Sequence, residues 1–127
     1  SNFLVIVSGV LYAYFIYFVK PDNEWDVISH PIQAIFQAMH ILVSPLLILA
    51  FGMIWSSHIQ VKLLLKELTK KRSGLLLLFL FLIMLFSGYG IQVTKGEFLR
   101  KLVIASHLVS SFFWIIIFFL HSFYKKF

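Results

Sequence analysis

Four long apolar stretches constrain the fold of this chain more than any other feature. They run from about 2–19, 31–59, 74–93 and 97–124, with short polar links between them. An α-helix needs roughly 20 apolar residues to cross the hydrocarbon core of a bilayer. Because lipid offers no partners to backbone polar groups, helices are the expected structure of such spans. The sequence therefore predicts an all-α integral membrane protein, an up-and-down bundle of four helices.

The composition agrees with a protein that lies almost wholly in the membrane. Hydrophobic residues make up 61% of the 127 residues and charged residues only 13%, whereas a soluble domain carries about a quarter charged residues. Little of the chain is left for a soluble domain. We therefore expect residues 1–127 to form a single transmembrane domain of two pseudo-repeated helical hairpins, about 1–59 and 74–127.

The charges predict a topology rather than a nucleic-acid partner. The net charge of +6 comes from short basic stretches and not from a broad basic surface. The link between the second and third spans is basic, and the link between the first and second is acidic. The residues concerned are Lys62, Lys66, Lys70, Lys71 and Arg72 in the former, and Asp22, Glu24 and Asp26 in the latter. By the positive-inside rule, both termini are expected in the cytoplasm.

Four of the five histidines fall in matching positions in two of the spans: His40 and His58 in one, and His107 and His121 in the other. An ionisable side chain at membrane depth is costly and indicates a functional site. Eighteen residues separate the first two histidines and 14 the second two, so each pair shares roughly one helical face at about 100° per residue. We expect an outer pair, His40 with His107, and an inner pair, His58 with His121. Each pair is predicted to ligate the iron of one haem. Because the chain has no cysteine, covalently attached c-type haem is excluded.

The two histidine separations do not match in length. Eighteen residues of helix span about 27 Å and 14 residues about 21 Å. Pro45 lies within the second span and could kink that helix enough to absorb the difference. The alternative is that His58 only lies at the headgroup level beside Trp55.

A weak internal repeat accompanies the histidines. Ser8-Gly9 in the first span matches Ser87-Gly88 in the third. A porphyrin face needs close approach of the backbone, which Gly9, Gly88 and Gly90 would permit. The alternative is that these small residues simply let membrane helices pack against one another.

With these residues the chain resembles the four-helix di-haem cytochrome b subunits of membrane oxidoreductases, such as those of formate dehydrogenase, nickel–iron hydrogenase and thiosulfate reductase. The resemblance implies a subunit of the bacterial inner membrane that is not an enzyme by itself. Its two non-covalent b haems would carry electrons across the bilayer between a quinone and a partner subunit, a cytochrome c or an iron–sulfur protein. Such subunits often have a histidine ligand in the first span. This chain has none there, which favours ligation by the second and fourth spans alone. The competing class is a non-redox membrane scaffold or small transporter subunit whose histidines bind a metal or protons.

Two further groups of residues have open interpretations. Arg100 and Lys101 could pair with haem propionates at the outer side, or they are solvated topology charges. His30, Gln33 and Gln37 form a line with His40 at spacings of 3, 4 and 3, which is one helical face. That line fits a quinone site at the outer surface. The alternative, which we favour, is that His30 is a polar interfacial residue at the start of a helix.

Overall fold

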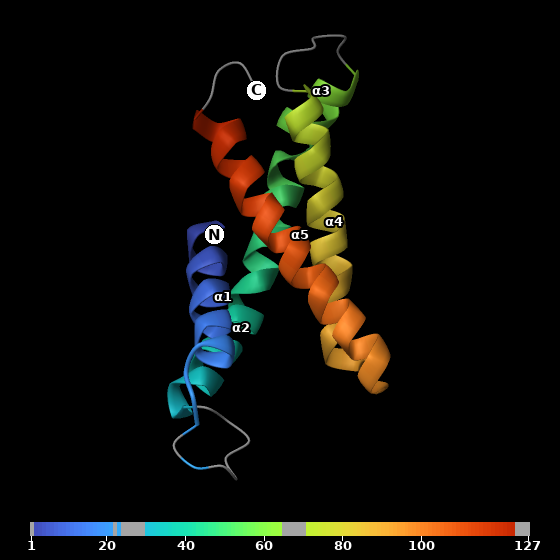
Figure 1. The fold of residues 1–127 in the computed structure, drawn as a ribbon. Helices are drawn as coiled ribbons and strands as arrows, with labels where there is room; N and C mark the ends of the chain where they lie inside the picture. Colours follow the sequence, from blue (N-terminus) through green and yellow to red (C-terminus); the bar gives the residue numbers. More distant parts are fainter. Residues whose placement is uncertain (1, 22, 24–29, 65–70, 124–127) are drawn as a thin grey trace. The chain divides into compact units, whose positions relative to one another are not determined.

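The structure is a computed structural model that describes residues 2–21, 23, 30–64 and 71–123, and the regular structure within these ranges is helical (Figure 1). The elements are α1 (Asn2–Tyr17), α2 (Pro31–Ile54), the π-helical segment η1 (Trp55–Ile59), α3 (Gln60–Leu64), α4 (Lys71–Val93) and α5 (Glu97–Phe123). The chain divides into two compact units, Ser1–Gln60 and Val61–Phe127.

The first unit is built on an antiparallel pair of helices, α1 and α2. Phe15, near the end of α1, stacks on Phe36 near the start of α2, with ring centroids 5.5 Å apart. The helix α2 starts where the sequence predicts, because Pro31 stands at its first position and has no amide proton to leave unpaired. It then continues through Pro45 without a break.

The second unit is the antiparallel pair α4 and α5, joined by the three residues Thr94 to Gly96. A connection this short forces consecutive helices to lie side by side. Glu97 begins α5, where a carboxylate is favourable near the positive end of the helix dipole. It also pairs with Lys101 one turn later, at 2.7 Å. Ser110 and Trp114 are the buried residues of α5.

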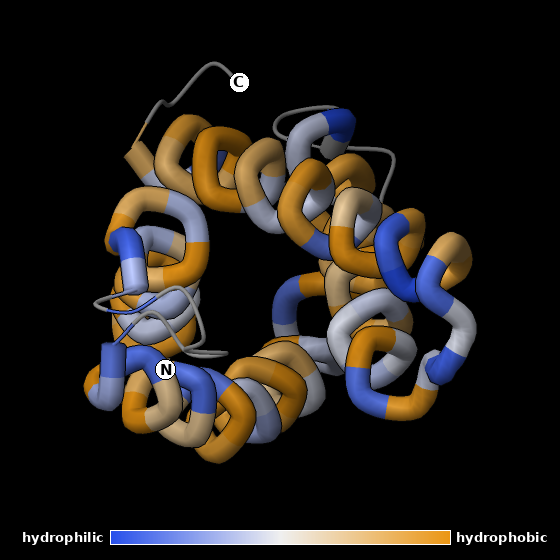
Figure 2. Tube along the Cα trace, turned by 60° about the horizontal axis from the view of Figure 1, so that its bottom comes forward, coloured by the Kyte–Doolittle hydropathy of each residue, from blue (hydrophilic) through white to orange (hydrophobic). Residues whose placement is uncertain are grey.

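Most of the apolar surface of these helices is exposed, as expected of helices that face lipid. Three described helical segments are long and apolar enough to cross a membrane: Pro31–Leu64, Arg72–Val93 and Glu97–Phe123. No more than 11% of their most apolar windows is buried inside the molecule. The hydrophobic colour predominates along the helices in Figure 2. These features support an integral membrane protein.

The first predicted span is shorter than expected. The helix α1 has 16 residues and ends at Tyr17 instead of Val19, so among the described residues it falls below the length of the other three segments. The fourth predicted span, in contrast, corresponds closely to α5, which ends at Phe123. The third begins earlier than predicted, at Lys71.

Candidate functional site

His40 lies against α1, beside the first Ser-Gly dipeptide. Its Nδ1 atom is 3.1 Å from the Oγ atom of Ser8, and Ser8 is buried. The Ser8 hydroxyl donates its one proton to the carbonyl oxygen of Val5, at 3.2 Å. This bond leaves a lone pair of the hydroxyl free to accept from the imidazole, an arrangement that favours the proton of His40 on Nδ1. In this tautomer the lone pair of a neutral ring is on Nε2.

His107 repeats this arrangement between α5 and α4. Its Nδ1 atom is 3.2 Å from the Oγ atom of Ser87 and 3.0 Å from the carbonyl oxygen of Met84. A carbonyl oxygen can only accept, so Nδ1 of His107 must carry the proton. The Ser87 hydroxyl in turn donates to the carbonyl oxygen of Ile83, at 2.6 Å. The two contacts give His107 the same tautomer as His40, again with the lone pair on Nε2.

His121 has a serine neighbour that the interpretation of the sequence missed. Its Nδ1 atom is 2.9 Å from the Oγ atom of Ser73. Ser73 belongs to a third Ser-Gly dipeptide, Ser73-Gly74, which lies 14 residues before Ser87-Gly88. His107 and His121 are also 14 residues apart. The equal spacing on antiparallel helices places both contacts in register, and it is the signal in the sequence that could have revealed Ser73.

The glycine of each Ser-Gly dipeptide faces the same imidazole as its serine. A Cβ atom built on Gly9 would lie 2.8 Å from Cε1 of His40, and one on Gly88 would lie 3.2 Å from Cε1 of His107. For Gly74 the distance to Cε1 of His121 is 3.6 Å. Gly90 behaves differently: its Cβ would lie 2.9 Å from a methyl carbon of Val103. The packing role thus accounts for Gly90, whereas Gly9 and Gly88 make room for histidine rings.

His58 occupies a different environment from the other three predicted ligands. It lies in η1, and its side chain is exposed. A π-helical turn takes more residues than an α-helical turn, so each residue rotates through less than 100°. The expectation that His40 and His58 share a face assumed a regular α-helix throughout 31–59, and η1 breaks that regularity.

His30 caps a helix. Its Nδ1 atom accepts a hydrogen bond from the backbone N–H of Ile32 at 3.2 Å, and its ring lies 5.6 Å from that of Phe15. The proton of neutral His30 is therefore on Nε2, opposite to His40 and His107. Gln33 is half-buried and Gln37 is exposed.

The predicted propionate partners lie at the start of α5 and are exposed. Lys101 already has an acidic partner in Glu97, and Arg100 lies one position before it along α5.

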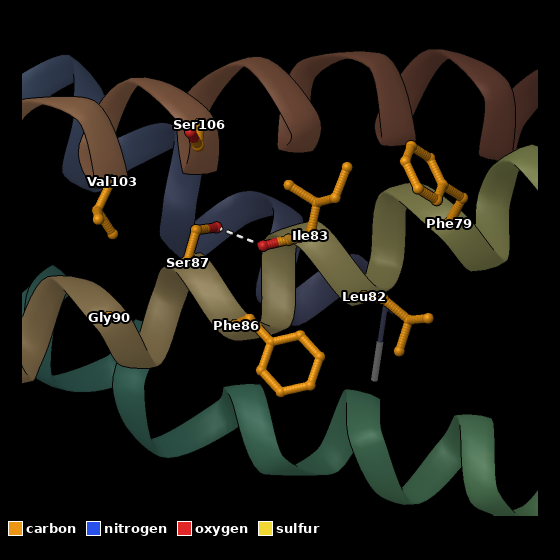
Figure 3. Close-up of a pocket in the computed structure, with 8 residues that line it drawn as sticks. All are labelled: Phe79, Leu82, Ile83, Phe86, Ser87, Gly90, Val103 and Ser106. Carbon is orange, nitrogen blue, oxygen red and sulfur yellow. Dashed lines mark hydrogen bonds between the residues drawn. The ribbon is translucent and has the colours of Figure 1, made fainter.

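An open apolar groove of about 460 Å³ runs along the α4–α5 pair and borders Ser87 (Figure 3). The dashed line in Figure 3 is the bond from the Ser87 hydroxyl to the Ile83 carbonyl. The walls of the groove are apolar apart from the hydroxyls of two serines. The residues that line it are Phe79, Leu82, Ile83, Phe86, Ser87, Gly90, Val103 and Ser106. The serine that orients His107 therefore adjoins apolar space.

Comparison with known proteins adds no identity to this geometry: no family model, no curated protein and no solved structure matches the chain.

Proposed function

We propose that this chain is a membrane-embedded electron-transfer subunit that holds two b haems, each between two histidines. The proposed pairs are His40 with His107 and His58 with His121, within a bundle of four helices. The observation that supports the proposal most is the hydrogen bonding of two imidazole Nδ1 atoms to a neighbouring helix. In His107 the bond to the Met84 carbonyl oxygen requires the proton on Nδ1, and in His40 the contact with Ser8 favours it there.

The donor set fits haem. Metal-ligating histidines generally donate their second ring N–H to a carbonyl or another acceptor, which fixes the ring and makes it more basic. Ser8 plays this part toward His40, and Met84 and Ser87 play it toward His107. A porphyrin already supplies four iron ligands, so a site needs only axial histidines from the protein. Single histidines suit that requirement, and three of the four, His40, His107 and His121, are backed by a serine.

The residues of the chain would bind the haems, orient them and shield them from water. Haem supplies one-electron redox chemistry when it is bound. The imidazoles would provide axial ligation, and the apolar faces of α2 and α5 would exclude water. The glycines of the Ser-Gly dipeptides let each imidazole lie close to the neighbouring backbone, at Gly9 and Gly88. Arg100 and Lys101 could neutralise propionates at the outer side.

The cellular setting belongs to the same proposal. The charges of the links support an orientation with both termini in the cytoplasm, in a bacterial inner membrane. With no soluble redox domain in these residues, the chain would exchange electrons with other subunits, a cytochrome c or an iron–sulfur protein. The Nδ1 atom of His30 accepts the N–H of Ile32 at the start of α2, so a quinone at His30 is the alternative to a purely capping role of this ring.

A haem count tests the proposal. We expect the purified full chain to give a b-type α-band in a reduced-minus-oxidised spectrum, and two haems per chain in a pyridine haemochrome assay. His58→Ala is the informative variant, because His58 is exposed and lies in η1. It should lower the count from two to one.

Each other result has a definite meaning. One haem in the parent chain, unchanged in His58→Ala, would remove the inner pair and leave the outer one. No haem would contradict the proposal and favour a scaffold or transporter subunit whose histidines bind a metal or protons. Binding of zinc or a pH-dependent transport current would then be the measurement to make.

A further inference from the structure

We infer that the serines of the three Ser-Gly dipeptides are positioning residues, which set the tautomer of His40, His107 and His121 so that Nε2 can bind a ligand. This inference rests on the proposed function for the identity of that ligand, but the tautomer itself can be tested without one. It adds Ser8, Ser87 and Ser73 to the site. The contact of Ser73 with His121 becomes the third example of the same arrangement, a serine Oγ beside the Nδ1 atom of a histidine on the neighbouring helix.

The recurrence of one geometry supports the inference. The chain contains three Ser-Gly dipeptides, and each serine Oγ lies between 2.9 and 3.2 Å from the Nδ1 atom of a histidine on the neighbouring helix. The three serines are buried, with 3%, 4% and 9% of their surface exposed. Packing alone requires small residues at such positions, but it does not require a hydroxyl opposite Nδ1 each time.

The direction of these bonds gives the serines their chemical effect. Ser8 and Ser87 use their own protons on carbonyl oxygens of the preceding turn, Val5 and Ile83. Their lone pairs are then offered to the imidazole N–H, which favours Nδ1–H over the Nε2–H form. At Ser73 the Oγ–Nδ1 distance is the shortest of the three, 2.9 Å, and we assign it the same role.

The glycine beside each serine leaves space for the histidine ring. Without a side chain at Gly9, the ring of His40 can lie close enough to α1 for Nδ1 to reach Ser8. The dipeptide therefore combines an acceptor with the space that the ring needs to reach it. The same combination holds at Ser87-Gly88 and Ser73-Gly74.

The test compares Ser8→Ala with a serine that forms no hydrogen bond with an imidazole in the described residues. Ser110 is the matched control, because it is equally well buried and its hydroxyl donates to the backbone oxygen of His107, at 3.1 Å. The first readout is histidine ¹⁵N NMR of the full chain produced without haem. We expect His40 and His107 as Nδ1–H tautomers in the parent and in Ser110→Ala, and a shift of His40 toward Nε2–H in Ser8→Ala.

The second readout is haem binding. Loss of such a supporting hydrogen bond typically weakens metal binding 10- to 100-fold, so Ser8→Ala should lower haem affinity by about that factor. Its haem midpoint potential should rise, since a less basic imidazole stabilises the ferric state less. Ser73→Ala should behave likewise. Ser87→Ala should lower haem affinity less, because the carbonyl oxygen of Met84 still accepts a hydrogen bond from Nδ1 of His107. Ser8→Thr keeps a hydroxyl and should restore most of the parent behaviour.

The outcomes separate the inference from the proposed function. Parent-like tautomers, affinity and potential in Ser8→Ala would overturn the inference, as would equal changes in Ser8→Ala and Ser110→Ala. Nδ1–H tautomers in a chain that binds no haem would uphold the role of the serines and contradict the proposed function.

Discussion

Gly9 has the least room for a side chain among the glycines that face a histidine. A Cβ atom there would lie 2.8 Å from Cε1 and 3.1 Å from Nδ1 of His40. The ring would have to rotate, and Nδ1 would leave Ser8. We therefore expect Gly9→Ala to weaken haem binding at His40 by at least about 10-fold, measured by titrating haem into the apoprotein.

The matched control is Gly52→Ala in the same unit, where a new Cβ would meet nothing within 4 Å. It should bind haem as the parent does. Gly88→Ala, at 3.2 Å, should have an intermediate effect, and Gly74→Ala, at 3.6 Å, the least. Equal behaviour of Gly9→Ala and Gly52→Ala would contradict a steric role for Gly9.

At this scale the sequence predicts residue types better than contacts. It identified the histidines and two of the dipeptides, because these stand out in an apolar chain. The equal spacing of 14 residues could have suggested Ser73 as the partner of His121. The sequence could not show that Gly90 faces Val103, because that contact depends on the rotation of two helices about their axes, which no local pattern encodes.

Among the elements, α2 shows both what local signals predict and what they miss. Its start at Pro31 follows from a proline at the first helical position. The segment η1 has no comparable signal in the sequence. A π-helix is defined by i→i+5 hydrogen bonds of the backbone, and the pattern of hydrophobic residues does not predict them. The sequence could therefore suggest a kink at Pro45 as the means of absorbing the difference between the two histidine separations. The change in helix type comes ten residues later, at Trp55.

The start of α2 offers a test of the role of His30. Loss of an N-cap typically costs about 0.5–2 kcal/mol, so His30→Ala should lower the free energy of unfolding in detergent by about that amount. His30→Asn should restore it, because an Asn side chain can accept from the Ile32 N–H. Both variants should keep the parent rate of haem reduction by a quinol. A slower rate in both, with stability restored in His30→Asn, would instead indicate that His30 accepts a proton from the quinol as the quinol is oxidised.

For the whole molecule, the central prediction is that His40 and His107 ligate the same haem. His40 and His107 belong to different units, and the proposal assigns them to the same iron. His40→Ala and His107→Ala should each remove or convert to high spin the same haem, identified by its α-band and potential. The double variant should lose no more haem than either single variant. Additive losses would mean that the two histidines serve different irons.

The placement of Ser73 and His121 has an electrical consequence. Ser73 lies in the first turn of α4 and His121 in the last turn of α5, close to the ends of both helices. The contact of Ser87 with His107 lies 14 residues further along, about 21 Å at 1.5 Å per residue. The hydrocarbon core of a bilayer is about 30 Å thick. A charge carried between these two levels would traverse much of the membrane's insulating layer, and it would do work against the transmembrane voltage, up to about 2.3 kcal/mol per 100 mV for a full crossing.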